Sequence, residues 1–224
     1  MLLNKKTLKK NGDMQVGVWF DISWPIVPGM TEYKNRKTVS FIEKKTFNAD
    51  GVRESIITIG THTGTHIDAP AHFLEKGKTM GEFEMKPITG PCAVLDLSSV
   101  HEVITEHDLA PYVDYIKGFR VLLKTKNSAR AYNEPFDAQF VYLSHGGAQF
   151  LMEHQAAAVG IDYLGIEHSQ QDHPTHKTLL GADIPIVEGL RLQHVSEGEY
   201  FLVCVPLSVP TLEAAPARAL LWTS

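Results

Sequence analysis

The sequence has 224 residues, of which 43% are hydrophobic and 21% charged, a composition typical of a folded globular chain and not of a disordered or fibrous one. Its formal net charge of −5, without a basic stripe, argues against binding to nucleic acid. No apolar run approaches the roughly 18–20 residues that cross a bilayer, and no signal-peptide pattern is present. We therefore expect a cytoplasmic protein that does not enter a membrane.

Strands dominate the predicted elements, because segments rich in β-branched and aromatic residues recur along the chain. In chain order the predicted strands are Val16–Ile22, Val39–Phe47, Glu54–Ile59, Ala93–Leu97, Phe119–Lys124, Phe140–Leu143, Gly160–Ile166 and Tyr200–Val205. Helices are predicted over Thr105–Tyr115 and Gly147–Ala158. Residues 1–12, rich in lysine, predict a flexible tail ahead of a single domain at 13–224.

The order of these elements predicts the fold class. Phe140–Leu143, the helix at Gly147–Ala158 and the apolar strand Gly160–Ile166 have the pattern of a βαβ unit. The N-terminal half has the pattern of antiparallel strands, so we expect a mixed α/β (α+β) domain with a sheet-rich N-terminal half. Cys92 and Cys204 lie in apolar runs, which predicts buried thiols and neither a disulfide nor a thiolate metal site.

The segment from His62 to His72 reads His-Thr-Gly-Thr-His-Ile-Asp-Ala-Pro-Ala-His and concentrates three histidines and one carboxylate. In a straight strand, at about 3.3 Å per residue, His62 and His66 would lie about 13 Å apart, too far to share one ion. Gly64 and Pro70 are residue types that let the chain bend. We therefore predict a bent segment that gathers these side chains around a metal ion.

The side chains of this segment, imidazole and carboxylate, suit zinc and also manganese or ferrous iron. Three ligands, His62, His66 and Asp68, would leave a position for water, as in catalytic zinc sites, where bound water has a pKa near 7. If His72 were a fourth ligand, the site would be structural, and this alternative stays open. The residues predict a divalent metal cofactor, and ligand type alone does not name the metal; we expect zinc, with manganese as the alternative.

These residues resemble the motif of the cyclase superfamily, approximately His-x-Gly-Thr-His-x-Asp-x-Pro-x-His, and every fixed position agrees. The family contains bacterial kynurenine formamidases and isatin hydrolases. The resemblance covers most of the chain, through Asp21-Ile22-Ser23, Pro28-Gly29, Gly90-Pro91-Cys92, Gly160-Ile161-Asp162 and Val187-Glu188-Gly189-Leu190. In formamidases a further histidine precedes the glutamate of the last segment by twelve residues, as His176 precedes Glu188.

The resemblance implies a site with one or two metal ions. The implied metal ligands are His62, His66, Asp68, His176 and Glu188, with Asp68 bridging the two ions. The family's catalytic histidine corresponds to His72, which relays a proton to the leaving nitrogen and must stay off the metal to do so.

The resemblance also implies a fold and a reaction. The fold is a swivelling β/β/α domain, found as homo-oligomers, here a dimer or a tetramer. The implied reaction is hydrolysis of a small amide (an N-formyl amine, a lactam or a cyclic imide), as in the arylformamidases of tryptophan catabolism. The partner is therefore a small-molecule substrate.

Two departures from the formamidase pattern leave the substrate open. Val27 stands where formamidases carry an aromatic residue before Pro-Gly, and Glu167, followed by His168, stands where Asp is usual. Hydrolysis of an ester or lactone, a cyclisation, and a non-catalytic protein that binds metal or a small molecule remain alternatives.

Two polar positions outside the motif also have alternative interpretations. Asp162 lies in an apolar run and needs a partner, so it either braces a ligating histidine or bonds to a neighbouring loop. The loop around Asp172 and His173 is rich in polar residues and is predicted to be solvated.

Overall fold

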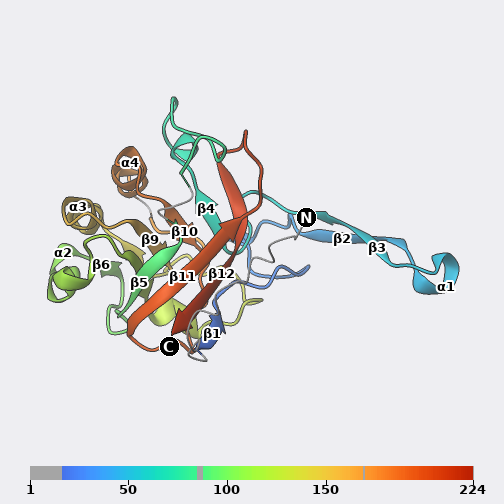
Figure 1. Cartoon of the computed structure of the whole chain (residues 1–224), viewed down its shortest axis with the longest axis horizontal. Helices are drawn as coiled ribbons and strands as arrows, with labels where there is room; N and C mark the ends of the chain where they lie inside the picture. Colours follow the sequence, from blue (N-terminus) through green and yellow to red (C-terminus); the bar gives the residue numbers. More distant parts are fainter. Residues whose placement is uncertain (1–16, 85–87, 169, 224) are drawn as a thin grey trace, which may run out of the picture.

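The structure, a computed structural model, describes residues 17–84, 88–168 and 170–223 (Figure 1). The predicted tail at 1–12 lies outside them. Within these residues, eight strands form the main sheet: β1 (Val18–Asp21), β4 (His66–Asp68), β5 (Gly90–Asp96), β7 (Arg120–Lys124), β9 (Ala158–Ile161), β10 (Ile186–Glu188), β11 (Gly198–Pro206) and β12 (Ala214–Thr223). Among the described residues, no helix is both long and apolar enough to cross a membrane.

The main sheet closes on itself. Its order is β1-β12-β11-β5-β7-β9-β10-β4, and β4 also pairs with the first residues of β12. The pairs from β5 to β10 are parallel, and the others are antiparallel. Because β12 pairs with β4 near its start and with β1 near its end, the sheet curls into a barrel-like core with few free edges.

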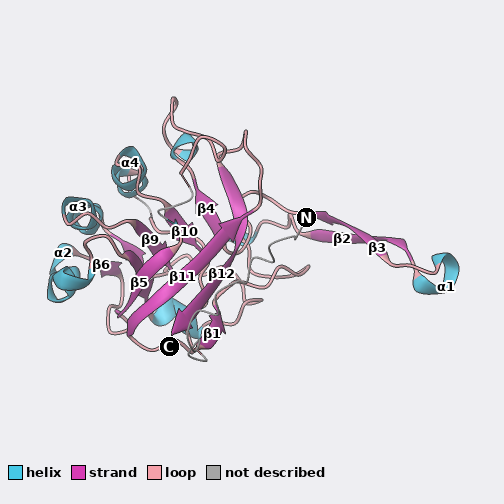
Figure 2. Ribbon diagram, in the orientation of Figure 1, coloured by secondary structure: helices cyan, strands magenta, loops and turns pink. Residues whose placement is uncertain are grey.

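Helices cover one side of this barrel, as Figure 2 shows. They are α2 (Glu106–Leu109), which continues as a 3-10 helix over Ala110–Tyr115, α3 (His145–Glu153) and α4 (Pro174–Gly181). The three segments lie in the connections between successive parallel strands, as crossover connections require. Thr105 and Asp108 form a capping box at the start of α2, which explains why the helix begins there.

Two apolar clusters follow from the alternation of side chains along the parallel strands. On β7, Val121 and Leu123 pack against the helices, together with Leu151 of α3 and Leu179 of α4. Leu122, between them in sequence, points the other way into the barrel interior. A strand that is buried on both faces reads as a continuous apolar run, which is why β7 is evident from the sequence.

A two-stranded arm extends away from the barrel (Figure 1). It consists of β2 (Ser40–Lys45), the short helix α1 (Phe47–Asp50) and β3 (Glu54–Thr58), close to the strands predicted from sequence. Phe41 faces Ile57 and Ile42 faces Ile56 across the arm, and all four side chains are exposed. Since neighbouring residues of a strand point to opposite faces, both faces of the arm are apolar.

The mixed α/β class is confirmed, and both cysteines are buried and free as predicted. The predicted βαβ unit is wrong in its pairing. Phe140–Leu143 forms only the short strand β8 (Tyr142–Leu143), which pairs with β6 (Val103–Ile104) and not with β9. The strand predicted over Gly160–Ile166 ends earlier, because β9 spans Ala158–Ile161.

Other predicted elements shift or were missed. The helix predicted over Gly147–Ala158 is α3, which begins and ends earlier and is capped by the Ser144 hydroxyl. Strands β4, β10 and β12 and helix α4 were not predicted. β4 and β10 are three residues long, and α4 begins directly after the polar loop around Asp172 and His173.

Candidate active site

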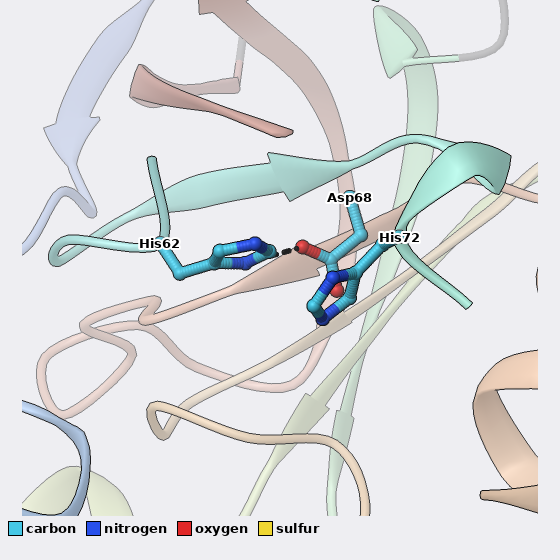
Figure 3. A group of neighbouring side chains, drawn as sticks. All are labelled: His62, Asp68 and His72. Carbon is cyan, nitrogen blue, oxygen red and sulfur yellow. Dashed lines mark ion pairs between the residues drawn. The ribbon is translucent and has the colours of Figure 1, made fainter. Parts of the chain in front are cut away.

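The segment from His62 to His72 bends as its glycine and proline predict (Figure 3). Gly64 adopts a left-handed conformation, with φ of 60°, ahead of β4. Pro70 then begins a 3-10 turn that ends at His72. The turn brings the His72 ring back against the His62 ring, with centroids 4.1 Å apart. The bend thus gathers on one side of the molecule side chains that a straight strand would spread out.

A close contact between two loops fixes this bend. Gly189, just after β10, has φ of 71°, and a Cβ atom there would lie 2.2 Å from the Gly64 carbonyl oxygen. The Thr65 hydroxyl donates a hydrogen bond of 2.6 Å to the Gly189 carbonyl. Only glycine fits at position 189, and the contact locks the start of β4 to the end of β10.

Asp68 lies at the centre of the site and is 0% exposed. One of its oxygens, Oδ1, is 3.0 Å from His62 Nδ1 and 3.5 Å from His66 Nε2. Its other oxygen, Oδ2, is 3.8 Å from His176 Nε2. Figure 3 shows His62 and His72 directed toward this carboxylate from the two ends of the bent segment. A single carboxylate therefore faces three of the predicted ligands.

His176 and Glu188 approach from other elements. Glu188, at the end of β10, places Oε1 3.4 Å from His176 Nε2 and Oε2 3.4 Å from His66 Nε2. The Ile166 N–H donates a hydrogen bond of 2.7 Å to Glu188 Oε1 and fixes the carboxylate. The structure thus brings together all six residues predicted for the site, although they come from three separate parts of the chain.

Two histidines of the site are oriented through their second ring nitrogen. His66 Nδ1 lies 2.9 Å from the Gly64 carbonyl, which can only accept, so Nδ1 carries a proton and Nε2 faces the carboxylates. His176 Nδ1 lies 2.6 Å from Glu167 Oε2, and the His176 backbone N–H donates to the same oxygen at 3.0 Å. Such partners fix the ring and tautomer of a metal-binding histidine.

The site contains buried polar atoms that the described residues leave without a hydrogen bond. These atoms are His66 Nε2, both carboxylate oxygens of Asp68 and one oxygen of Glu167. A buried polar atom without a partner is costly, and buried charges are normally paired or bound to a metal. The residues therefore fit a divalent cation held between imidazole nitrogens and carboxylate oxygens.

Ligand atoms close enough to share an ion form three groups among the described residues. Asp68 joins His62 and His72 in one group and His66 and Glu188 in a second. A third group consists of Glu167, His173 and His176. Asp68 belongs to two groups, as a carboxylate that bridges two ions would.

The carboxylates give the site a strong preference for positive charge. Burial lowers the pKa of His66, but Glu188 and Asp68 outweigh this effect and raise the pKa to about 9. For His176, burial is outweighed by Glu167, Glu188 and Asp68, and the pKa rises to about 10. Burial of Glu188 is likewise outweighed by His176 and His66, which hold its pKa well below the usual range. The two histidine shifts report a negative environment suited to a cation, and the Glu188 shift shows that its carboxylate stays ionised beside the histidines.

His72 differs from the other histidines. Burial lowers its pKa below the usual value, an effect that His62 and His176 reinforce and that Asp68 and Glu188 oppose. The ring is therefore neutral near pH 7 and can accept a proton. A neutral base beside cation-binding residues is the arrangement expected of a proton relay.

A cavity of about 320 Å³ opens onto these residues. Its lining includes His62, His72, His176 and Glu188, together with residues that the sequence analysis did not assign to the site: Tyr33, Lys34, Arg36, Phe73 and His173. His173, predicted to be solvated, is half exposed by its side chain but borders the cavity. The segment at 32–38 carries no motif of its own, so only its position in the fold reveals it.

Of two further carboxylates, Glu213 borders the site and Asp162 does not. Glu213, just ahead of β12, lies 3.5 Å from His62 Nε2 and accepts a hydrogen bond of 2.7 Å from the Thr61 hydroxyl. Asp162 does not reach the site. It accepts hydrogen bonds from Thr125 and Ser128, which supports the loop-bonding alternative and not the bracing of a histidine.

Comparison with known proteins places the chain in a family. Residues 20–168 match the family model described as "Putative cyclase", and the chain belongs to this cyclase family. It is 31% identical to a kynurenine formamidase of Geobacillus thermodenitrificans, over 91% of this chain and 96% of that protein. A kynurenine formamidase of Bacillus cereus is 28% identical, over 93% of this chain and 99% of that protein.

Solved structures show the same fold. A structure described as a potential metal-dependent hydrolase with cyclase activity is 41% identical, with a TM-score of 0.84 over 93% of this chain and 99% of that one. An isatin hydrolase bound to the product analogue thioisatinate is 18% identical, with a TM-score of 0.81 over 92% of each chain.

Proposed function

We propose that the protein is a metal-dependent hydrolase that cleaves the C–N bond of a small amide, such as an N-formyl amine, a lactam or a cyclic imide. The observation that carries the proposal is the buried Asp68 carboxylate, which faces three histidines with both oxygens free of hydrogen bonds. The kinship with kynurenine formamidases supports the choice of an amide.

His62, His66 and Asp68 would hold one divalent ion, and Asp68, His176 and Glu188 would hold a second. Zinc suits this set of ligands best, and manganese is the alternative. When bound, such an ion supplies Lewis acidity and lowers the pKa of a coordinated water toward neutrality.

Residues of the chain have separate roles in the proposed reaction. His72, neutral near pH 7, accepts a proton at a free ring nitrogen and delivers it to the leaving nitrogen of the amide. Glu167 and the Gly64 carbonyl hold His176 and His66 in the required tautomer. Phe73 stacks on His176, with ring centroids 4.3 Å apart, and keeps this side of the site apolar.

One observation favours a second role for His72. Its nitrogen belongs to the group that also contains His62 and Asp68, close enough to share an ion with them. As a ligand, His72 would close the site, and the protein would bind metal without turnover. Metal content and activity of a His72→Ala variant separate the two roles.

The test is metal analysis by plasma mass spectrometry of the purified protein and of His66→Ala and Glu188→Ala, with hydrolysis of N-formylkynurenine and isatin assayed in parallel. His194→Ala, which removes an exposed histidine outside the site, is the matched control. We expect about two equivalents of metal, reduced by either site substitution together with turnover. Absence of any bound transition metal after reloading would refute the proposal.

The exposed arm supports a further proposal, that the chain forms a homo-oligomer, a dimer or a tetramer. An isolated two-stranded ribbon is marginally stable in water, and this one exposes apolar side chains on both faces. Its charges balance, with Lys44, Lys45 and Arg53 against Glu43, Asp50 and Glu54, so two copies do not repel each other.

Light scattering coupled to size-exclusion chromatography tests this assembly. A double substitution, Ile42→Lys with Ile57→Lys, places charge on both faces of the arm and should shift the mass toward that of the monomer. Lys44→Glu, which leaves the apolar pairs intact, serves as a control. A monomeric wild-type protein would contradict the proposal.

A further inference from the structure

The two carboxylate oxygens of Glu167 have different surroundings. Oε2 lies 2.6 Å from His176 Nδ1 and accepts a hydrogen bond of 3.0 Å from the His176 backbone N–H. Oε1 is shielded from solvent and has no hydrogen-bond partner among the described residues. The Glu167 side chain as a whole is only 1% exposed. Because a buried carboxylate oxygen without a partner is costly, Oε1 is available to a ligand.

His173 faces this oxygen across a short gap. Its Nδ1 lies 4.0 Å from Glu167 Oε1, beyond the range of a hydrogen bond. Zinc binds imidazole nitrogen and carboxylate oxygen at about 2.0–2.2 Å, so one ion fits between two such atoms at this separation. Glu167, His173 and His176 also form a group whose ligand atoms lie within 4.8 Å of one another. The gap therefore matches a bridging cation and not a direct hydrogen bond.

The His173 ring is held in this position, although 57% of its side chain is exposed. The Phe73 ring packs against the His173 ring, with centroids 4.6 Å apart, and against the His176 ring at 4.3 Å. Asp172 and His173 both have positive φ, 63° and 53°. A residue before proline normally adopts extended backbone, so Pro174 adds to the strain at His173. Backbone strain that the surrounding structure maintains is typical of functional sites.

We propose that Glu167 Oε1 and His173 Nδ1 form an additional, weak site for a divalent cation, separate from the two ions proposed around Asp68. Imidazole and carboxylate suit zinc and neighbouring transition metals, and water completes the coordination. The site has only two protein ligands, because Glu167 Oε2 stays on His176. The positive N-terminal end of α4, directly after His173, also lowers the affinity for a cation. The additional site therefore fills after the other two.

Glu167 couples the additional ion to the second of the two proposed ions. A cation on Oε1 withdraws negative charge from the carboxylate, so Oε2 attracts the Nδ1 proton of His176 less strongly and Nε2 becomes a weaker ligand. Glu167, His173 and His176 all line the cavity, so an ion held there occupies space open to a substrate. We therefore expect excess metal to inhibit amide hydrolysis. This consequence rests on the proposed function, whereas the ion site does not.

Cobalt binding to the zinc-loaded protein tests the additional site. The protein is saturated with zinc, freed of excess zinc and dialysed against Co²⁺ up to about 1 mM, the weak end of cation binding by proteins. Plasma mass spectrometry then counts zinc and cobalt separately. We expect the wild type to bind about one equivalent of Co²⁺ while its zinc content stays unchanged. No bound cobalt in the wild type would overturn the proposal.

Two variants of nearly equal shape separate a ligand role of His173 from a structural one. Asparagine and aspartate both tolerate positive φ, but only aspartate supplies a carboxylate ligand. His173→Asn should lose the cobalt equivalent and His173→Asp should keep it. His194→Asn, the same change at an exposed histidine outside the cavity, is the matched control and should bind cobalt as the wild type does. Equal cobalt binding by His173→Asn and His173→Asp would overturn the site.

An activity measurement tests the coupling and separates it from the ion site. Excess zinc should lower the rate of N-formylkynurenine hydrolysis by the wild type, and a weak chelator should restore the rate. The fractional inhibition should be smaller in His173→Asn than in His194→Asn. Equal inhibition of both variants would overturn the coupling through Glu167. If no amide is hydrolysed, the proposed function alone fails, and the cobalt content of the His173 variants still decides the ion site.

Discussion

Two aspartates of this protein are equally buried, yet they have opposite surroundings. Asp162, after β9, accepts hydrogen bonds from the backbone N–H and hydroxyl groups of Thr125 and Ser128, at distances from 2.6 to 3.0 Å. Asp68, at the end of β4, accepts no hydrogen bond and faces histidine nitrogens instead. Both side chains are fully shielded from solvent.

The difference shows how a buried carboxylate reveals its role. The four donors around Asp162 make it part of the scaffold, since they join the loop after β7 to the end of β9. The histidines around Asp68 leave room only for a cation or a reacting molecule. Burial alone does not distinguish the two carboxylates, whereas the identity of their hydrogen-bond or ion-pair partners does.

The largest effect is expected from Asp68→Ala. Loss of the shared carboxylate removes a ligand of both proposed ions, so kcat/KM should fall by more than about 1000-fold. The free energy of unfolding of the metal-free protein should fall as well, because the buried His66 and His176, whose pKa values Asp68 raises, lose a charged partner. Amide hydrolysis and urea unfolding, measured on the same preparation, test the two statements. A destabilised protein with normal metal content would place Asp68 in the same class as Asp162.

His72→Ala tests the proton relay. Because His72 is neutral near pH 7 and stands beside His62, its loss should lower kcat by about 100- to 10,000-fold, the range for general acid–base catalysis. Metal content, measured by plasma mass spectrometry, should stay at the wild-type value. A parallel loss of metal would instead identify His72 as a metal ligand. It would then support the interpretation of the site as structural.

Sequence patterns predicted which side chains cluster in the structure better than they predicted the fold around them. The motif from His62 to His72 contains its own bend, with Gly64 and Pro70 at the turns, so its clustering follows from local chemistry. The approach of His176 and Glu188 depends on α4 and β10, and these elements lack strong periodicity. The separation of twelve residues carried by the family resemblance supplied that link.

The elements and contacts that the sequence did not predict also depend on contacts between distant segments. β4 and β10 are three residues long, too short for an alternation pattern to show, and they are stabilised by pairing within the closed sheet. The role of Glu167 was hidden because nothing in the sequence indicates that its side chain meets His176. The place of Lys34 and Arg36 in the cavity lining was hidden for the same reason. Contacts between distant segments decide these features.

Asp162→Ala provides the counterpart to the Asp68 variant. It leaves the Thr125 and Ser128 N–H groups buried without an acceptor, so the free energy of unfolding should fall by about 3 kcal/mol. Activity per folded molecule and metal content should stay close to wild type. Urea denaturation gives the first quantity and an assay well below the unfolding transition gives the second. A stability equal to that of the wild type would show that water replaces the carboxylate in this loop.

The smallest effect is expected from Glu167→Gln, which tests whether a carboxylate outside the proposed ligand set acts through His176. The amide can still accept from the His176 backbone N–H, but it no longer draws the Nδ1 proton with a full negative charge, so Nε2 becomes a weaker ligand. We expect a 10- to 100-fold loss of affinity for one of two metal ions, measured by chelator competition, with the other ion unaffected. The visible absorption of the cobalt-substituted protein should change at the same site. Glu167→Asp, which keeps the charge on a shorter side chain, should recover part of the affinity. If Glu167→Gln and Glu167→Asp reduce the affinity for both ions equally, Glu167 is a scaffold residue like Asp162. Of the three carboxylates compared, Asp68 alone would then act on the metal site.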